Sequence, residues 1–269
     1  MLCGHLDLVC AADAHGRTFL REQSFRAPFH LSKPYWDEHA LIVQIVNPTA
    51  GVFAGDVLTS RVAIESGARL LLTTPSANRI HAMPSGRASV EQHFSVADGG
   101  WLEVMPELFI PQAQCRYRQR TSIDVAVGGE MFFVETLAPG RVARGEKFAF
   151  TEIDWEFELR HAGHLIARER FVLQPSDEST ATLRHPFATG YYASCYVITA
   201  RISQDHEVWR AIHDISSDNA LVGVSRLVAG GSTIKILAAG SIALTRTLRA
   251  VRSLLAPYIP PLLCASRKL

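Results

Sequence analysis

The feature of this sequence that most restricts its fold is an alternation of apolar and polar residues with a period of two. In residues 57–65, Leu58, Val62 and Ile64 share one side of this alternation, and the charged residues fall on the other. Because successive side chains of a β-strand point to opposite faces, the pattern predicts a half-buried strand. Similar patterns predict further strands at residues 6–9, 18–25, 41–46, 88–97, 101–105, 115–127, 131–137, 147–160, 164–173, 191–202 and 223–237.

Helical spacing of apolar residues occurs only late in the chain, at residues 206–215 and 241–257, with Ser241 as the expected N-cap of the second helix. Glycine- and proline-containing turns separate the strands before them at short intervals. No internal repeat of constant period is visible, so the residues alone do not predict a regular solenoid. We predict one mainly β domain over residues 1–269, β-rich in 1–202 and helix-containing in 203–269.

The composition excludes several classes of protein. With 48% apolar residues the 269-residue chain can bury a large core, which is not typical of a disordered adaptor. The 27 Lys and Arg residues balance 26 Asp and Glu residues, so nucleic acid is not an expected partner. The five cysteines are scattered without a C-x-x-C pair, which favours free thiols in a reducing cytoplasm. Neither an export signal nor a membrane-spanning segment is predicted.

A turn rich in proline and glycine, residues 47–56, precedes the strand at 57–65. Gly51 and Gly55 give the backbone freedom on either side of two apolar residues. Asp56 then stands where the chain leaves the turn. This carboxylate could accept backbone N–H groups of the turn or could face a cavity, and the sequence leaves both alternatives open.

Two strings near this turn carry a resemblance to a known family. Residues 47–56 read NPTAGVFAGD, and residues 67–81 read GARLLLTTPSANRIH. They resemble the UreD (UreH) family of urease accessory proteins, in which P-x-G-G-x-x-x-G-D precedes a strand and then L-x-T-x-P-x-A-x-K-x-Y. Stretches at residues 102–106, 140–148 and 168–170 agree in order, so the resemblance covers about residues 30–255. Departures from the pattern stand at Ala50, Ala54, Arg79, His81 and the C-terminal PPLLCASRKL.

The resemblance implies a fold in which strands wind into a β-helix-like stack of sheets, with the two helices packed near the C-terminus. It also marks a set of structural motif residues: Gly51, Gly55, Thr74, Pro75, Gly140, Arg141 and Gly145. It implies a non-enzymatic scaffold for urease maturation that binds the urease structural subunits, a UreF-like protein and, through it, a UreG-like GTPase. A diverged module that binds proteins but has lost any role with nickel is the alternative.

The sequence contains no complete motif for nucleotide binding or for hydrolytic catalysis. Residues 140–147 have the glycine spacing of a phosphate-binding loop, but Glu146 stands where a lysine would neutralise the phosphate charge. Phe148 stands where the Ser or Thr that binds Mg²⁺ would be. The chain has no G-x-S-x-G and no H-E-x-x-H, so the common hydrolase signatures are missing as well. We expect no tightly bound cofactor.

Five carboxylates on or beside predicted strands remain as candidate site residues: Asp56, Glu103, Glu135, Glu146 and Glu169. Buried ionised groups need partners, and ion pairs with Arg141, Arg144 or Arg168 are one interpretation. The other is a hydrated, carboxylate-lined passage, where sparse oxygen ligands would hold a divalent ion weakly. The resemblance favours a passage for transient Ni²⁺, since UreD-type proteins pass nickel towards the urease active site.

The helix predicted at residues 241–257 carries an apolar stripe of Leu244, Leu248, Val251 and Leu255. An amphipathic helix late in a β-rich chain must place such a stripe against another surface. The resemblance puts the helical region near the interface with the UreF-like partner. We therefore expect these four residues to bind that partner.

Overall fold

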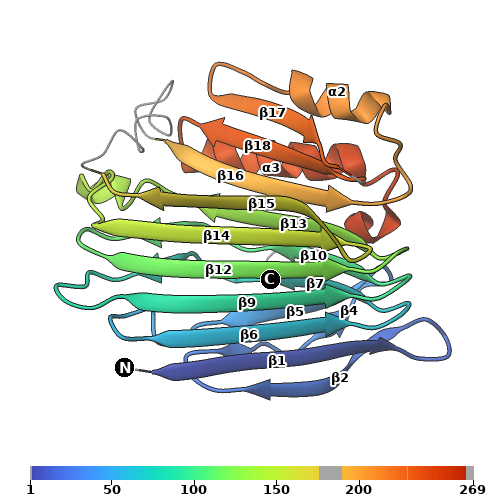
Figure 1. The fold of residues 1–269 in the computed structure, drawn as a ribbon, viewed down its shortest axis with the longest axis horizontal. Coiled ribbons are helices and arrows are strands. Elements are labelled where there is room, and N and C mark those ends of the chain that lie inside the picture. The colour runs from blue at the N-terminus through green and yellow to red at the C-terminus, as the bar shows by residue number, and fades with distance from the viewer. Residues whose placement is uncertain (1, 176–189, 229, 265–269) are drawn as a thin grey trace.

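The computed structural model describes residues 2–175, 190–228 and 230–264, and its strands form two layers (Figure 1). The first sheet has the order β15-β14-β12-β9-β6-β1-β2. Its strands are β1 (Cys3–Ala12), β2 (Thr18–Phe25), β6 (Val57–Ile64), β9 (Ala88–Val96), β12 (Arg116–Val125), β14 (Glu152–His161) and β15 (His164–Leu173). Strands β1, β6, β9, β12 and β14 are parallel, and β2 and β15 run antiparallel at the two ends.

The second sheet has the order β17-β18-β16-β13-β10-β7-β5-β3, with β4 paired to β5. Its strands are β3 (His30–Leu31), β4 (Tyr35–Trp36), β5 (Leu41–Val46), β7 (Arg69–Thr73), β10 (Trp101–Met105), β13 (Glu130–Leu137), β16 (Tyr191–Ile198), β17 (Ala220–Arg226) and β18 (Ser232–Ala238). The chain alternates between the sheets from β6 to β14, so successive coils stack in the β-solenoid-like manner that the resemblance implied. A separate short pair joins β8 (Asn78–Ile80) and β11 (Phe109–Pro111).

The two ends of the coils differ in the length of their connections. At one end, turns such as residues 97–100 and 126–129 join the sheets directly. At the other, longer loops carry β8, β11 and the 3₁₀ turn η1 (Val142–Arg144). We call this side the long-loop end; it lies at the left in Figure 1.

The core occupies both the space between the sheets and the outer face of the second sheet. Between the sheets, leucine, valine and phenylalanine side chains of the parallel strands interlock. Behind the second sheet, α2 (Glu207–Asp214) and α3 (Ser241–Leu255) cover the faces of β13, β16 and β18 that point away from the first sheet. The 3₁₀ turn η3 (Pro260–Leu263) follows α3 in the chain. A mainly β fold with two late helices is therefore confirmed.

Several predicted boundaries need correction, for example that of the strand expected at 191–202, which ends at Ile198. The strand expected at 223–237 is the hairpin of β17 and β18, because Gly230 and Gly231 turn the chain with positive φ. The strand expected from 147 begins at Glu152, since Phe148 has a φ of 50° that no strand adopts. Ser241 is the first residue of α3, and the N-cap is Gly240.

Candidate functional site

The turn of residues 47–56 lies at the long-loop end and is closed by the buried side chain of Asp56. Its Oδ1 accepts the backbone N–H of Leu2 at 3.1 Å, and its Oδ2 accepts that of Phe53 at 2.9 Å. Both oxygens therefore stabilise the turn and the start of the first strand. The geometry matches the turn-capping alternative for this residue.

The same turn requires its two glycines. Gly51 has a φ of 148°, and a Cβ there would lie 2.4 Å from a backbone carbonyl oxygen, while Gly55 has a φ of 83°. Ala50 also has a positive φ, 64°, so the alanine holds the conformation that glycine adopts most easily. His81 stacks on Phe53 with ring centroids 4.3 Å apart. Two of the departures from the family pattern thus keep the shape of the turn and an aromatic contact.

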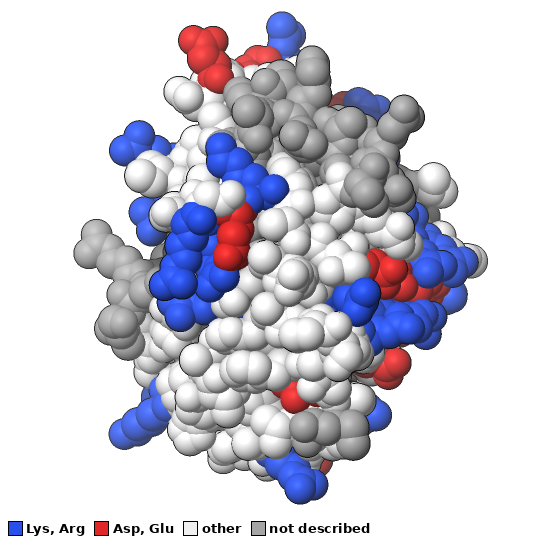
Figure 2. Space-filling model, turned by 90° about the vertical axis from the view of Figure 1, so that its left-hand side faces the viewer, with Lys and Arg blue, Asp and Glu red and all other residues white. Residues whose placement is uncertain are grey.

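A cavity of about 270 Å³ lies between the two sheets and reaches the loops of the long-loop end. Its wall is mostly apolar, but Ser60, Gln92, Gln119 and Glu135 bring polar groups to it from four strands. At the loop side, its lining includes residues 73–74 and 76–79, among them Thr74, whose Oγ1 accepts the N–H of residue 107 at 2.9 Å. Figure 2 shows that the middle of this end is largely free of charged side chains, whereas basic and acidic side chains gather at its left and right margins.

Glu135 extends from β13 into the space between the sheets. Its Oε1 accepts three hydrogen bonds, from Gln119 Nε2 at 2.9 Å, Trp155 Nε1 at 3.0 Å and Thr121 Oγ1 at 3.1 Å. Burial raises the pKa of this carboxyl from 4.5 to about 7, against the three hydrogen bonds and the charge of Lys235, which lower it. All three donors meet the same carboxyl oxygen, Oε1.

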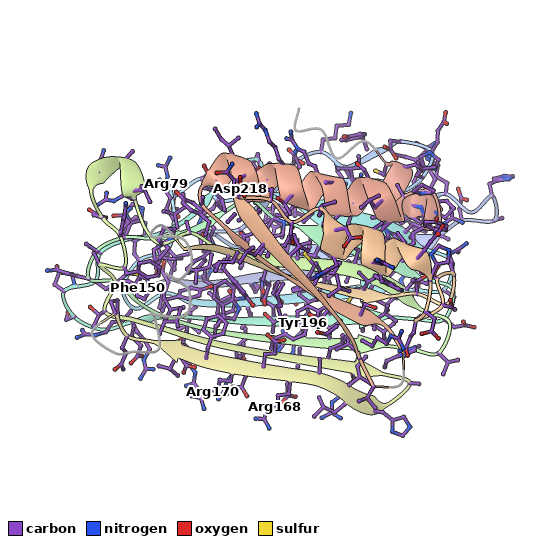
Figure 3. All side chains as sticks on the ribbon, turned by 90° about the horizontal axis from the view of Figure 1, so that it is seen from above. Arg79, Phe150, Arg168, Arg170, Tyr196 and Asp218 are labelled. Atoms are coloured by element: carbon purple, nitrogen blue, oxygen red, sulfur yellow. The ribbon has the colours of Figure 1, made fainter. Side chains whose placement is uncertain are left out.

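Glu135 also lines a second, much smaller cavity of about 10 Å³, together with Glu169 of β15 and Ser194 of β16. Glu169 forms an ion pair with Lys235 of β18, and both side chains are about one third exposed. Tyr196 lies beside them, pointing between the sheets in Figure 3. Two of the five candidate carboxylates therefore meet around one small cavity.

Glu103 and Glu146 are elsewhere, each in an ion pair. Glu103 is fully buried on the outer face of the second sheet, where Arg252 of α3 donates to both its oxygens at 2.6 and 3.0 Å. Glu146 accepts from Arg141 Nε at 2.7 Å, and this contact lowers the pKa of the carboxyl. For both residues the structural ion-pair interpretation fits the geometry.

The motif around Glu146 is a compact loop. Gly140 has a φ of 138°, and a Cβ there would lie 2.6 Å from the carbonyl oxygen of Glu146. Gly145 ends η1 in a left-handed conformation with a φ of 77°. Arg141 thus closes a loop shaped by two glycines. Pro75, which belongs to the motif at residues 67–81, lies exposed in the turn after β7.

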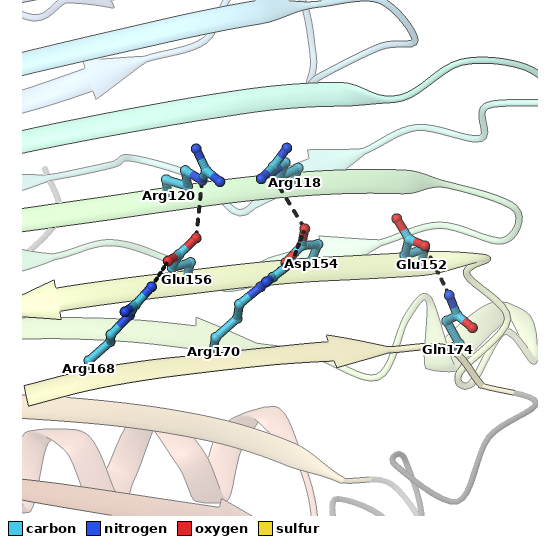
Figure 4. Close-up of polar contacts among 8 residues, drawn as sticks. All are labelled: Arg118, Arg120, Glu152, Asp154, Glu156, Arg168, Arg170 and Gln174. Atoms are coloured by element: carbon cyan, nitrogen blue, oxygen red, sulfur yellow. Dashed lines mark hydrogen bonds and ion pairs between the residues drawn. The ribbon is translucent and has the colours of Figure 1, made fainter.

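Arg168 forms ion pairs with acidic residues other than the five candidates. On the outer face of the first sheet, Asp154 lies between Arg118 and Arg170, and Glu156 lies between Arg120 and Arg168, at 3.1 to 3.5 Å (Figure 4). The two carboxylates are only 10% and 14% exposed, because the arginines cover them. The interpretation that pairs Arg168 with one of the five candidate carboxylates is therefore not supported, since its partners are Glu156 and Glu158.

The apolar stripe of α3 is already occupied. Leu244, Val251 and Leu255 are fully buried and Leu248 is 5% exposed, all packed against the outer face of the second sheet. A partner cannot contact these side chains unless the helix leaves its own core. The apolar stripe does pack against another surface, as an amphipathic helix requires, but that surface belongs to the same chain and not to a partner.

Sequence reasoning missed the side chains that surround Glu135 and Glu169. Gln119, Trp155 and Lys235 come from strands that only the coiled topology brings together. One signal was present, since Lys235 interrupts an apolar strand between two buried isoleucines. Among the described residues, no group of three or more His, Cys, Asp or Glu side chains could hold a metal ion.

Comparison with known proteins identifies the family. Residues 3–265 match the family described as UreD urease accessory protein. The chain is 45% identical to a urease accessory protein UreD of Opitutus terrae over 99% of this chain and 98% of that protein. It is 28% identical to one of Acetivibrio thermocellus, over 89% of this chain and 92% of that protein. No helix in the described ranges is long and apolar enough to cross a membrane. The chain belongs to the UreD family of urease accessory proteins.

Proposed function

We propose that this protein is a cytoplasmic, non-enzymatic urease maturation factor that passes nickel through the space between its two sheets. The observation that carries the proposal is the cavity of about 270 Å³ that reaches from the long-loop end to Glu135. Glu135 in turn borders the small cavity that Glu169 lines. The two carboxylates therefore stand one after the other along a possible route.

The chemistry of the route suits a transient cargo. A volume of about 270 Å³ is far above the roughly 10–15 Å³ that a cavity needs to hold one water molecule, so a partly hydrated ion has room. Carboxylate, amide and hydroxyl oxygens of Glu135, Gln119 and Thr121 are hard ligands that bind Ni²⁺ less strongly than imidazole or thiolate would. Weak, open coordination allows release, which a carrier needs more than retention.

The other three candidate carboxylates contribute less to this proposal. Asp56 is engaged by two backbone N–H groups, and Glu103 and Glu146 are paired with arginines. Because their oxygens already have these partners, we infer that they stabilise the fold and do not line the route. Glu135 and Glu169 are the residues whose charge should control nickel transfer.

Nickel delivery to urease tests the route. Glu135→Gln and Glu169→Gln preserve size and remove the charge. Glu158→Gln is the matched control, because Glu158 is 31% exposed, against 35% for Glu169, and pairs with Arg168 on the outer surface. We expect both test variants to assemble with their partners but to load less nickel into urease, while the control behaves as the unmodified protein. Normal nickel loading by the double variant Glu135→Gln/Glu169→Gln would refute the route.

The partners follow from family membership together with the failed phosphate-binding loop. We infer that the chain binds urease structural subunits and a UreF-like protein, and that a UreG-like protein supplies nucleotide hydrolysis. Because the α3 stripe is buried, these partners would bind other surfaces. Co-purification of tagged urease subunits with this chain, with and without nickel, tests the assembly.

The alternative is a diverged protein-binding module without a nickel route. The departures at Ala50, Ala54 and His81 prompted it, but Ala50 keeps a positive φ and His81 keeps an aromatic contact. The end of the altered C-terminus, residues 265–269, lies outside the described residues. Assembly that is complete and independent of nickel, with unchanged loading in every carboxylate variant, would favour this alternative.

A further inference from the structure

The ammonium group of Lys235 contacts two of the residues that line the small cavity, Glu169 and Ser194. Lys235 projects from β18 and donates through Nζ to Ser194 Oγ at 2.6 Å, to Tyr196 Oη at 3.2 Å and to Glu169 Oε2. Ser194 and Tyr196 belong to β16 of the same sheet, whereas Glu169 belongs to β15 of the other. The Lys235–Glu169 ion pair therefore bridges the two sheets where β15 forms an edge.

The ammonium occupies the place that a cation would take. Its three oxygen partners, a carboxylate and two hydroxyls, are hard donors of the kind that divalent ions bind. The adjoining cavity of about 10 Å³ holds about one water molecule, so a hydrated ion has no room beside the lysine. The positive charge of Lys235 would also repel a cation in the adjoining position.

The side chain of Lys235 can leave this position. Its side chain is 33% exposed, and the flexible four-carbon stem of lysine lets the ammonium swing into solvent without a change in the backbone. Movement would free Glu169 and Ser194, which both line the small cavity, at the same time. A single rotamer change would therefore vacate the position beside Glu169.

We propose that Lys235 is the gate of this passage: its ammonium holds the cation position beside Glu169 and must move away before a divalent ion can pass. The proposal rests on the proposed function, because a gate needs a route, but it assigns a residue and a mechanism that the route alone does not specify. Lys235 acts as a positioning and selecting residue and is not itself a metal ligand.

Titration of the purified, untagged accessory complex with Ni²⁺ alone tests the gate. Lys235→Met keeps an unbranched side chain as far as Cε and removes the ammonium, and Lys235→Arg is the matched control that keeps the charge. We expect Lys235→Met to bind Ni²⁺ at least tenfold more tightly than the unmodified protein and Lys235→Arg to show no gain. Adding Glu169→Gln to Lys235→Met should abolish the gain.

The outcomes separate the gate from the route. Unchanged affinity in Lys235→Met, or a gain that survives Glu169→Gln, would overturn the gate. A gain that depends on Glu169 supports the cation position that Lys235 holds, and normal nickel loading of urease by the double variant Glu135→Gln/Glu169→Gln would overturn the route alone. If Lys235→Met does not fold, Lys235→Gln, which can still donate to the hydroxyls of β16, replaces it under the same criteria.

Discussion

Replacing Glu135 by glutamine should make the protein more stable at alkaline pH while it impairs nickel transfer. The folded state raises the pKa of this carboxyl from 4.5 to about 7, because burial disfavours the charged form. A group with a raised pKa contributes stability at low pH and loses it as the pH rises through about 7. At pH 8 the buried carboxylate of Glu135 therefore lowers the free energy of unfolding, because the same carboxylate is fully hydrated in the unfolded chain.

The magnitude follows from the pKa. Each tenfold change in proton affinity corresponds to about 1.4 kcal/mol, so a rise from 4.5 to about 7 corresponds to about 3 kcal/mol at pH 8. Less than about 1 kcal/mol of this cost applies at pH 5. Glutamine keeps an acceptor oxygen for the three donors that now meet Oε1 of Glu135, and it does not titrate.

The assay is thermal unfolding of both proteins at pH 5 and pH 8. For a chain of this size about 1 kcal/mol shifts Tm by about 2 °C, so the variant should gain roughly 4 °C more at pH 8 than at pH 5. The surface variant Glu158→Gln provides the baseline for losing a carboxylate outside the cavity. An equal difference in Tm at both pH values would refute the reasoning, because the cost would then not arise from ionisation.

Three further predictions concern stability. Gly51→Ala should lower the free energy of unfolding by about 1–3 kcal/mol, because of its positive φ and the close backbone carbonyl. Gly223→Ala, with open space around the added Cβ, should have little effect in the same urea titration. Arg252→Met should cost about 3–5 kcal/mol, since it strands a buried carboxylate, whereas Arg249→Met on the exposed side of α3 should be nearly neutral. Deletion from Ser241 onward should abolish soluble expression, because it uncovers the outer face of the second sheet; a soluble, cooperatively folding truncation would contradict this.

The sequence predicted local structure well wherever one face of a strand is buried. The alternation in residues 57–65 reappears as β6, with Leu58, Val62 and Ile64 in the core. The coiled arrangement was accessible only through the family resemblance, because the coils differ in length and carry no constant repeat. The positive φ of Phe148, which delays the start of one predicted strand to Glu152, has no signature in residue type.

The candidate site was predicted only in part, for a physical reason. Asp56, Glu103 and Glu146 have the same residue types as Glu135 and Glu169, and what separates them is the identity of their partners. Those partners are distant in sequence: Arg252 lies 149 residues from Glu103, and Lys235 lies 66 residues from Glu169. A pattern confined to one strand cannot report contacts of this kind.

The two antiparallel strands at the ends of the first sheet determine where the stack of coils stops. A parallel stack offers its last strand to any further strand, and exposed edges of this kind promote aggregation into fibrils. Here hairpins reverse the chain at both ends, and the terminal strands β2 and β15 carry charged residues such as Arg21, Glu22, Arg168 and Arg170. An incoming strand would meet these charges at either edge. The number of coils is thus fixed within one molecule, and the edges resist joining one copy to the next.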